Sequence, residues 1–185
     1  MKIFKTLLLT FIFLTFSVKA DLSQNLINEL DEGGKLVFIR HAYAPGSGDP
    51  QNFNLYDCST QRNLNDSGRN QSKNIGRLFS KYNIEIKNIY SSEWCRCKET
   101  ASIAFQKFET KKFLNSFYSA KFAKNREKQV KEFNNFIKLW NRKDNLIFVT
   151  HYVFISEILN YAPSSGEIII TDKNLNIIDT LEIRY

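Results

Sequence analysis

KLVFIRH, residues 35–41, is the stretch that decides the fold: it is a short apolar run with a histidine directly after it. Such a run, preceded by two glycines, is typical of a buried strand. A second run, LIFVTH at residues 146–151, has the same form and also ends in a histidine. The chain of 185 residues contains two histidines, and each of them directly follows one of these two runs. Because catalytic groups of open α/β sheets gather at the carboxyl ends of strands, we interpret His41 and His151 as parts of one site.

Apolar runs and helical patterns alternate along the rest of the chain, which predicts an α/β fold. A long loop is expected at residues 41–63, which are rich in Gly, Pro, Asp and Asn. The expected helices lie at 65–80, 99–105, 124–140 and 154–160, and the further strands at 89–92, 168–170 and 175–181. Helices between strands cover both faces of a sheet. The sequence therefore predicts a single three-layer α/β/α domain, residues 21–185, with a mostly parallel central sheet.

Residues 1–20 are predicted to be a cleaved signal peptide and no part of the fold. Two lysines precede an uncharged, mostly apolar stretch at residues 6–18, and Val18 and Ala20 fit a cleavage site. This stretch of 13 residues is short for a membrane span, which needs about 20 residues. An uncleaved membrane anchor is the alternative interpretation. We expect the mature protein to be periplasmic or secreted, without stable insertion in the membrane.

The charge of the chain does not indicate a nucleic-acid partner. Residues 1–20 hold three of the 26 basic residues and no acid, which leaves 23 basic against 19 acidic residues. No basic run with interleaved aromatic residues occurs, so we expect no nucleic-acid binding. The chain contains sixteen Phe and eight Tyr. Intrinsically disordered proteins are poor in aromatic residues, so this composition argues against a disordered protein.

Export changes the interpretation of the cysteines, which are Cys58, Cys95 and Cys97. In an oxidising compartment a disulfide is the default for a close pair. Cys95 and Cys97 are two residues apart, an awkward separation for a bond between them. We therefore expect Cys58 to pair with one of the two, and either partner remains open. Three Cys and two distant His offer no recognisable ligand spacing, so neither a metal nor another cofactor is expected.

Two arginines accompany the histidines. Arg40 directly precedes His41, and Arg96 follows the strand at residues 89–92, near the expected start of a helix. A guanidinium group binds the oxygens of a phosphoryl group, and an imidazole can attack phosphorus as a neutral nucleophile. The two arginines and two histidines together indicate phosphoryl chemistry.

Four motifs, in this order, resemble those of the histidine phosphatase superfamily, the phosphoglycerate mutase-like fold. They are RHA at residues 40–42, NLNDSGRNQ at 63–71, SSEWCRCKETA at 91–101 and FVTHYVFI at 148–155. Ala42 stands where the family has Gly, and Glu99 where it has Gln. The segments that contain DCSTQRNL and WCRC are further similar to an exported bacterial subgroup.

The resemblance implies a role for each residue of the site. His41 would be the nucleophile that forms a phosphohistidine. Arg40 and Arg96 would bind the phosphoryl oxygens. His151 would hydrogen-bond the same group and stabilise its charge in the transition state. No metal is implied, because the arginines supply the positive charge.

A leaving-group acid is missing from the motifs. Many members carry a Glu in the loop that here reads FLNSF, residues 113–117, and another branch has Asp where Tyr152 stands. Asp49, Asp57 or Glu157 could serve instead, or none of them.

These interpretations lead to one main hypothesis and two alternatives. The main hypothesis is an exported phosphatase that hydrolyses phosphomonoesters or phosphorylated envelope components through phosphorylated His41. Its substrate would be a phosphorylated small molecule or an envelope glycan or lipid. The first alternative is a catalytically weak envelope protein of the same fold that binds phosphate groups. The second is a structural envelope protein held by its disulfide.

Overall fold

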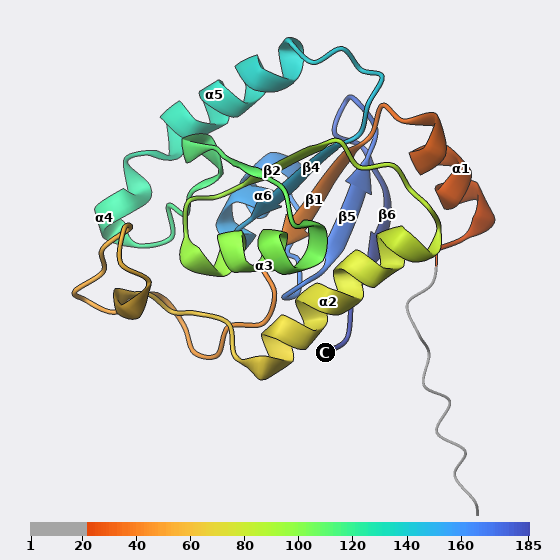
Figure 1. Cartoon of the computed structure of the whole chain (residues 1–185). Helices are drawn as coiled ribbons and strands as arrows, with labels where there is room; N and C mark the ends of the chain where they lie inside the picture. The colour runs from red at the N-terminus through yellow and green to blue at the C-terminus, as the bar shows by residue number, and fades with distance from the viewer. Residues whose placement is uncertain (1–21) are drawn as a thin grey trace, which may run out of the picture.

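The computed structural model describes residues 22–185 (Figure 1), so the predicted signal peptide lies outside the described residues. Within this range the sheet has six strands in the order β3-β2-β4-β1-β5-β6. The strands are β1 (Leu36–Arg40), β2 (Asn88–Ser91), β3 (Glu109–Thr110), β4 (Leu146–Thr150), β5 (Ile168–Thr171) and β6 (Ile177–Leu181). The pairs β1–β4, β4–β2 and β2–β3 are parallel, whereas β5 is antiparallel to β1 and β6 to β5. The expected mostly parallel α/β sheet is confirmed.

Helices cover both faces of this sheet. They are α1 (Gln24–Glu32), α2 (Asp66–Lys81), α3 (Cys95–Phe105), α4 (Ala120–Ala123), α5 (Arg126–Lys138) and α6 (Tyr152–Leu159), with the 3₁₀ turns η1 (Cys58–Thr60) and η2 (Lys112–Leu114). Figure 1 shows α2 and α3 lying across one face of the sheet.

Alternation along the central strands builds the two cores, because successive side chains of a strand point to opposite faces. Val37 and Ile39 of β1 pack in one cluster with apolar residues of α1, α2 and α3. Leu36 and Phe38 belong to the opposite cluster, with residues of α5 and α6 such as Phe133. The continuous apolar run of β1 thus serves both faces, which gives the predicted three layers.

Helix α2 shows how local sequence fixes the layer beside the site. Asn65 caps the helix, since its side-chain Oδ1 accepts a hydrogen bond from the backbone N–H of Gly68 at 3.0 Å. Ile75 on its buried face packs into the core, as its spacing predicts. Gly76 allows close approach of α3, because a Cβ at this position would lie 2.4 Å from the carbonyl oxygen of Ala104.

Several elements differ from the sequence-based expectation, and the short strand β3 was not predicted. Helix α1 was not predicted, although Ser23 caps it and Leu26 is buried on its inner face. Helix α3 runs from Cys95 to Phe105, so it includes the expected 99–105 and has Arg96 in its first turn. Helix α5 is shorter than the expected 124–140, because the chain forms α4 just before it and Leu139 after it is 89% exposed.

None of the helices within residues 22–185 combines the length and the apolar character that crossing a membrane requires.

Candidate active site

Strand register places the two histidines side by side. Arg40, the last residue of β1, pairs with Thr150, the last residue of β4, so the histidine after each strand emerges at the same edge. The backbone N–H of His41 donates to the carbonyl oxygen of Thr150 at 2.9 Å. The ring centroids of His41 and His151 are 5.5 Å apart, and both residues are buried. The structure therefore brings together the two histidines that are 110 residues apart in the sequence.

Arg96 joins them from the first turn of α3, which follows β2, the other neighbour of β4. Its Nε donates to Nε2 of His41 at 3.2 Å, and its Nη2 lies 3.5 Å from Nδ1 of His151. The residue is 3% exposed, so its charge acts in a site with little water. One edge of this guanidinium thus faces both imidazoles.

The hydrogen bonds of His41 define which of its nitrogens can react. Its Nδ1 lies 2.8 Å from the carbonyl oxygen of Ala42, which only accepts, so Nδ1 carries the proton. Nε2 accepts from Arg96 and therefore has a lone pair directed into the site. Burial, and then the positive charge of Arg96, lowers the pKa of His41 well below its usual value. The imidazole is neutral at physiological pH, the form that can attack phosphorus.

His151 has its proton on the other ring nitrogen, Nε2, because of a chain of hydrogen-bonded polar groups. Its Nδ1 faces the donor Nη2 of Arg96, so its Nε2 carries the proton and donates to Oγ of Ser92 at 2.8 Å. Ser92 donates in turn to Oδ1 of Asn115 at 3.1 Å, and the Asn115 amide donates to Glu93 at 2.7 Å. Burial and then the charge of Arg96 lower the pKa of His151 well below its usual value. His151 can therefore accept a hydrogen bond at the site but holds no extra proton.

Arg40 has one donor without a partner among the described residues. Its Nη1 donates to the carbonyl oxygen of Pro163 at 2.8 Å, and its guanidinium carbon lies 5.6 Å from the ring centre of Tyr152. Its Nε is buried and has no hydrogen-bond partner among the described residues. A buried donor without a partner is costly, so an anion that reached it would be favoured.

A third arginine, Arg62, also lines the site, and the sequence analysis missed it. Its Nε donates to the carbonyl oxygen of Gly48 at 2.8 Å, and its Nη1 donates to the carbonyl oxygen of Ala44. Burial and then the charge of Arg96 lower the pKa of Arg62. The signal in the sequence was its place in DCSTQRNL, residues 57–64, a segment that resembles the exported subgroup.

The three candidate acids lie in different places. Asp49 is in the site, 2.7 Å from Nη1 of Arg96. Asp57 is exposed and caps η1 through its bond to the backbone N–H of Ser59. Glu157 on α6 forms an ion pair with Arg126 at 2.8 Å on the surface. Among the three, only Asp49 faces the reacting groups.

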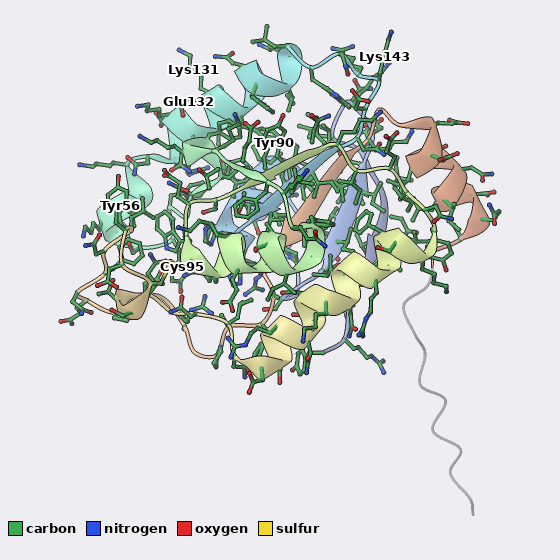
Figure 2. All side chains as sticks on the ribbon, viewed as in Figure 1. Tyr56, Tyr90, Cys95, Lys131, Glu132 and Lys143 are labelled. Atoms are coloured by element: carbon green, nitrogen blue, oxygen red, sulfur yellow. A yellow bond between two sulfur atoms is a disulfide. The ribbon has the colours of Figure 1, made fainter. Side chains whose placement is uncertain are left out.

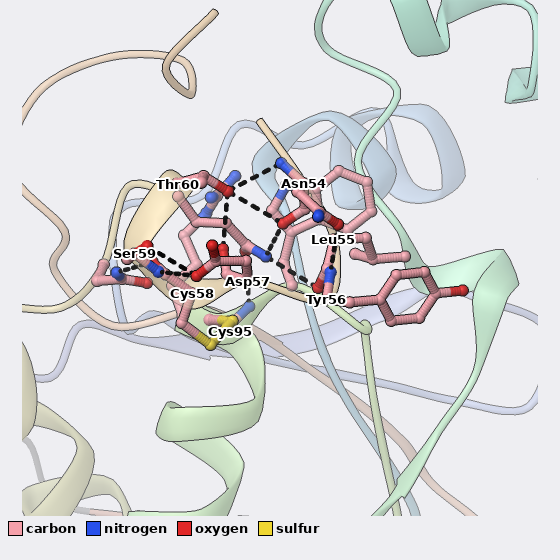
Figure 3. Close-up of a disulfide and its surroundings, with 12 residues drawn as sticks. Asn54, Leu55, Tyr56, Asp57, Cys58, Ser59, Thr60 and Cys95 are labelled. Carbon is pink, nitrogen blue, oxygen red and sulfur yellow. Dashed lines mark hydrogen bonds between the residues drawn. A yellow bond between two sulfur atoms is a disulfide. The ribbon is translucent and has the colours of Figure 1, made fainter. Parts of the chain in front are cut away.

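A disulfide attaches the 41–63 loop to α3. Cys58 bonds Cys95 (Figure 3), which decides between the two partners that the sequence left open. Cys97 is a free, buried thiol. Gln61 adds a hydrogen bond, since its Oε1 accepts from the backbone N–H of Cys95 at 3.0 Å. Cys95 lies at the start of α3 beside the loop, whose Tyr56 points outwards and is 88% exposed (Figure 2). The loop is thus tied to the residue next to Arg96.

A cavity of about 540 Å³ opens above these groups. The two histidines, three arginines and Asp49 line one part of it. Residues of the 46–51 loop, Lys121 and several aromatic residues line other parts, the aromatic ones being Phe53, Trp94, Tyr118, Phe122 and Tyr152. Cavities of this size accommodate small organic ligands. The cavity therefore has room for a phosphoryl group and for a larger group attached to it.

Two of three comparisons with known proteins find similarities. A family model described as histidine phosphatase superfamily (branch 1) matches residues 36–115. A comparison with curated proteins finds no match.

Among solved structures, SixA from Agrobacterium tumefaciens has a TM-score of 0.57 at 15% identity, with 80% of this chain and 97% of that chain covered. The protein TTHB049 from Thermus thermophilus has a TM-score of 0.59 at 12% identity, with 80% and 99% covered. The protein histidine phosphatase SixA complexed with tungstate has a TM-score of 0.52 at 12% identity, with 80% and 96% covered. These likenesses show that the fold is shared.

Proposed function

We propose that the chain, whose residues 36–115 match the histidine phosphatase superfamily, is an exported phosphatase that acts through a phosphohistidine on His41. The observation that carries the proposal is the state of His41: it is neutral, buried, and has the lone pair of Nε2 directed at the Nε edge of Arg96. A nucleophile and an anion-binding group thus converge on one point.

The proposed reaction has two steps. In the first, Nε2 of His41 attacks phosphorus, a P–N bond forms, and the P–O bond to the leaving group breaks. In the second, water attacks phosphorus, the P–N bond breaks, and inorganic phosphate leaves. Arg96 and the free Nε of Arg40 would hold the nonbridging oxygens, and their charges would stabilise the transition state without a metal.

The proposed substrates are phosphomonoesters or phosphorylated envelope components, such as a phosphorylated small molecule, glycan or lipid. The cavity of about 540 Å³ supports this class, because it exceeds what a phosphoryl group alone needs. One neighbour of the same fold is named a protein histidine phosphatase, so a phosphorylated imidazole is a further candidate substrate.

Export is part of the proposal. It is supported by the composition of residues 1–20, which fits a signal peptide, and by the Cys58–Cys95 disulfide. Disulfides persist in oxidising compartments such as the periplasm or the extracellular space.

A second candidate function is phosphate-group binding with weak or no turnover. One observation favours it: Asp49, the carboxylate that lines the cavity, already accepts four hydrogen bonds and has no proton to give. Poor leaving groups would then depart slowly.

Hydrolysis of p-nitrophenyl phosphate by residues 21–185 tests the proposal. We expect turnover by the wild type, none by His41→Ala, and a severe loss with retained tungstate binding in His151→Ala. Glu157→Gln is the matched control on the surface. Acid-quench labelling with radioactive substrate should give an acid-labile, base-stable phosphate on His41. Tungstate binding without turnover by the wild type would favour the binding protein, and label on Ser, Cys or Asp would overturn the mechanism.

A further inference from the structure

Asp49 contacts the one arginine that faces both histidines, and it does so from the side away from them. A guanidinium group has two edges that can each donate a pair of hydrogen bonds. The edge formed by Nε and Nη2 of Arg96 faces His41 and His151. The end formed by Nη1 and Nη2 faces Asp49, at 2.7 Å from Oδ1 and 3.2 Å from Oδ2.

We infer that Asp49 is a positioning residue that holds the Nε edge of Arg96 toward the phosphoryl site, and that it is not the acid that protonates the leaving group. The inference rests on the proposed function and adds to it.

The carboxylate of Asp49 is itself fixed from two other segments. Its Oδ1 also accepts from the backbone N–H of Arg62 at 3.1 Å, and its Oδ2 accepts from Nε1 of Trp94 at 3.1 Å. The side chain of Arg96 is 4% exposed and that of Asp49 17% exposed, so water does not compete strongly for either group. A two-point contact between a fixed carboxylate and a planar guanidinium fixes the orientation of the guanidinium.

Without Asp49 the far end of Arg96 would have little to hold it. The other contact of Nη1 among the described residues is the carbonyl oxygen of Arg62, at 3.3 Å. Both imidazoles accept hydrogen bonds from Arg96 through ring-nitrogen lone pairs. A phosphoryl group bound at the site would displace these hydrogen bonds. Asp49 is therefore the anchor that remains when substrate is bound.

The same contacts leave Asp49 without a proton. Burial alone would raise the pKa of Asp49, but the hydrogen bonds and charge of Arg96, together with the bonds from Arg62 and Trp94, lower it. The charged groups that interact with the Asp49 carboxylate are the guanidinium groups of Arg96 and Arg62, and both are cationic. Each carboxylate oxygen accepts two hydrogen bonds, so neither has a proton to donate.

The test compares Asp49→Asn with the wild type on two substrates, p-nitrophenyl phosphate and an alkyl phosphate. The first has a leaving group that departs without a proton and the second has one that needs it. We expect kcat to fall about 10- to 100-fold on both substrates by the same factor, the scale of losing a group that orients a reacting one. KM should not rise, since removing a negative charge does not weaken binding of an anion. A loss confined to the alkyl phosphate would make Asp49 the acid and overturn the inference.

Two further variants separate geometry from charge. Asp49→Glu keeps the charge and moves the carboxylate by one methylene, so it should not restore kcat, and full restoration would overturn the inference. Asp49→Asn in the Arg96→Lys background should change kcat less than about twofold, because Asp49 acts through Arg96. An undiminished loss in that background would also overturn it. Glu157→Gln again serves as the control.

One readout does not depend on turnover. The Nε–H signal of Arg96 in nitrogen-edited NMR spectra, assigned by its loss in Arg96→Lys, should be sharp in the wild type and broadened in Asp49→Asn. A wild type without activity would refute the proposed function alone, whereas an unchanged Nε–H signal in folded Asp49→Asn would refute the positioning role.

Discussion

Reduction of the Cys58–Cys95 disulfide should lower both the stability and the activity of the protein. The two cysteines are 37 residues apart, and in the chain-entropy model a loop of that length stabilises the folded state by about 4 kcal/mol. For a domain of this size each kcal/mol corresponds to about 2–4 °C, so the melting temperature should fall by about 8–16 °C on reduction. Activity should fall as well, because Cys95 adjoins Arg96 and Cys58 holds the loop that carries Asp49.

Thermal unfolding of residues 21–185 with and without reductant measures the first effect, and hydrolysis of p-nitrophenyl phosphate measures the second. The Cys58→Ser/Cys95→Ser double variant should match the reduced wild type and should not respond to reductant. Thiol titration in denaturant should give one reactive thiol before reduction. That thiol, Cys97, should be unreactive in the native protein, since burial raises its pKa to about 12. Three reactive thiols before reduction, or an unchanged melting temperature after it, would refute the reasoning.

Three further predictions concern single residues. Arg96→Lys should cost roughly 2–4 kcal/mol of transition-state stabilisation, because Lys cannot present a planar edge to both imidazoles, and a kcat/KM within about twofold of wild type would contradict this. Burial and the charge of Arg96 lower the pKa of both histidines, so below about pH 6.5 the unfolded chain binds protons that the folded chain does not. As the pH is lowered below this value, the free energy of unfolding measured in urea should fall by up to about 1.4 kcal/mol per pH unit for each histidine. In His151→Asn the free energy of unfolding should depend less steeply on pH. Gly76→Ala should destabilise the protein by about 1–3 kcal/mol despite the better helix propensity of Ala, because its Cβ would meet the Ala104 backbone. A higher melting temperature would count against that close contact.

Short-range patterns were enough to predict every strand except β3 and to select residues that the structure brings together at the candidate site. The apolar runs that precede His41 and His151 determine strands whose register then brings both histidines to one edge. Arg40 and Arg96 could be predicted because each lies within a few residues of such a strand.

Contacts between distant segments could not be predicted in the same way. Asp49 and Arg62 reach the site through the path of a long loop, which depends on the disulfide and on bonds to α3. The choice between Cys95 and Cys97 depends on where α3 begins. Residues that are two apart on a helix point to nearly opposite faces. The observed start of α3 shows that Cys95 faces the loop and Cys97 faces the core.

The first turn of α3 carries three consecutive residues with three separate contacts. Cys95 bonds the loop, Arg96 faces both histidines, and the thiol of Cys97 lies 3.5 Å from Nε2 of His151. One inserted residue would rotate everything after it by about 100° around the helix axis. A substitution in this turn affects one of the three contacts. An insertion or deletion between β2 and this turn would break all three contacts at once. The spacing between the end of β2 and this turn is therefore a part of the chain that tolerates little change in length.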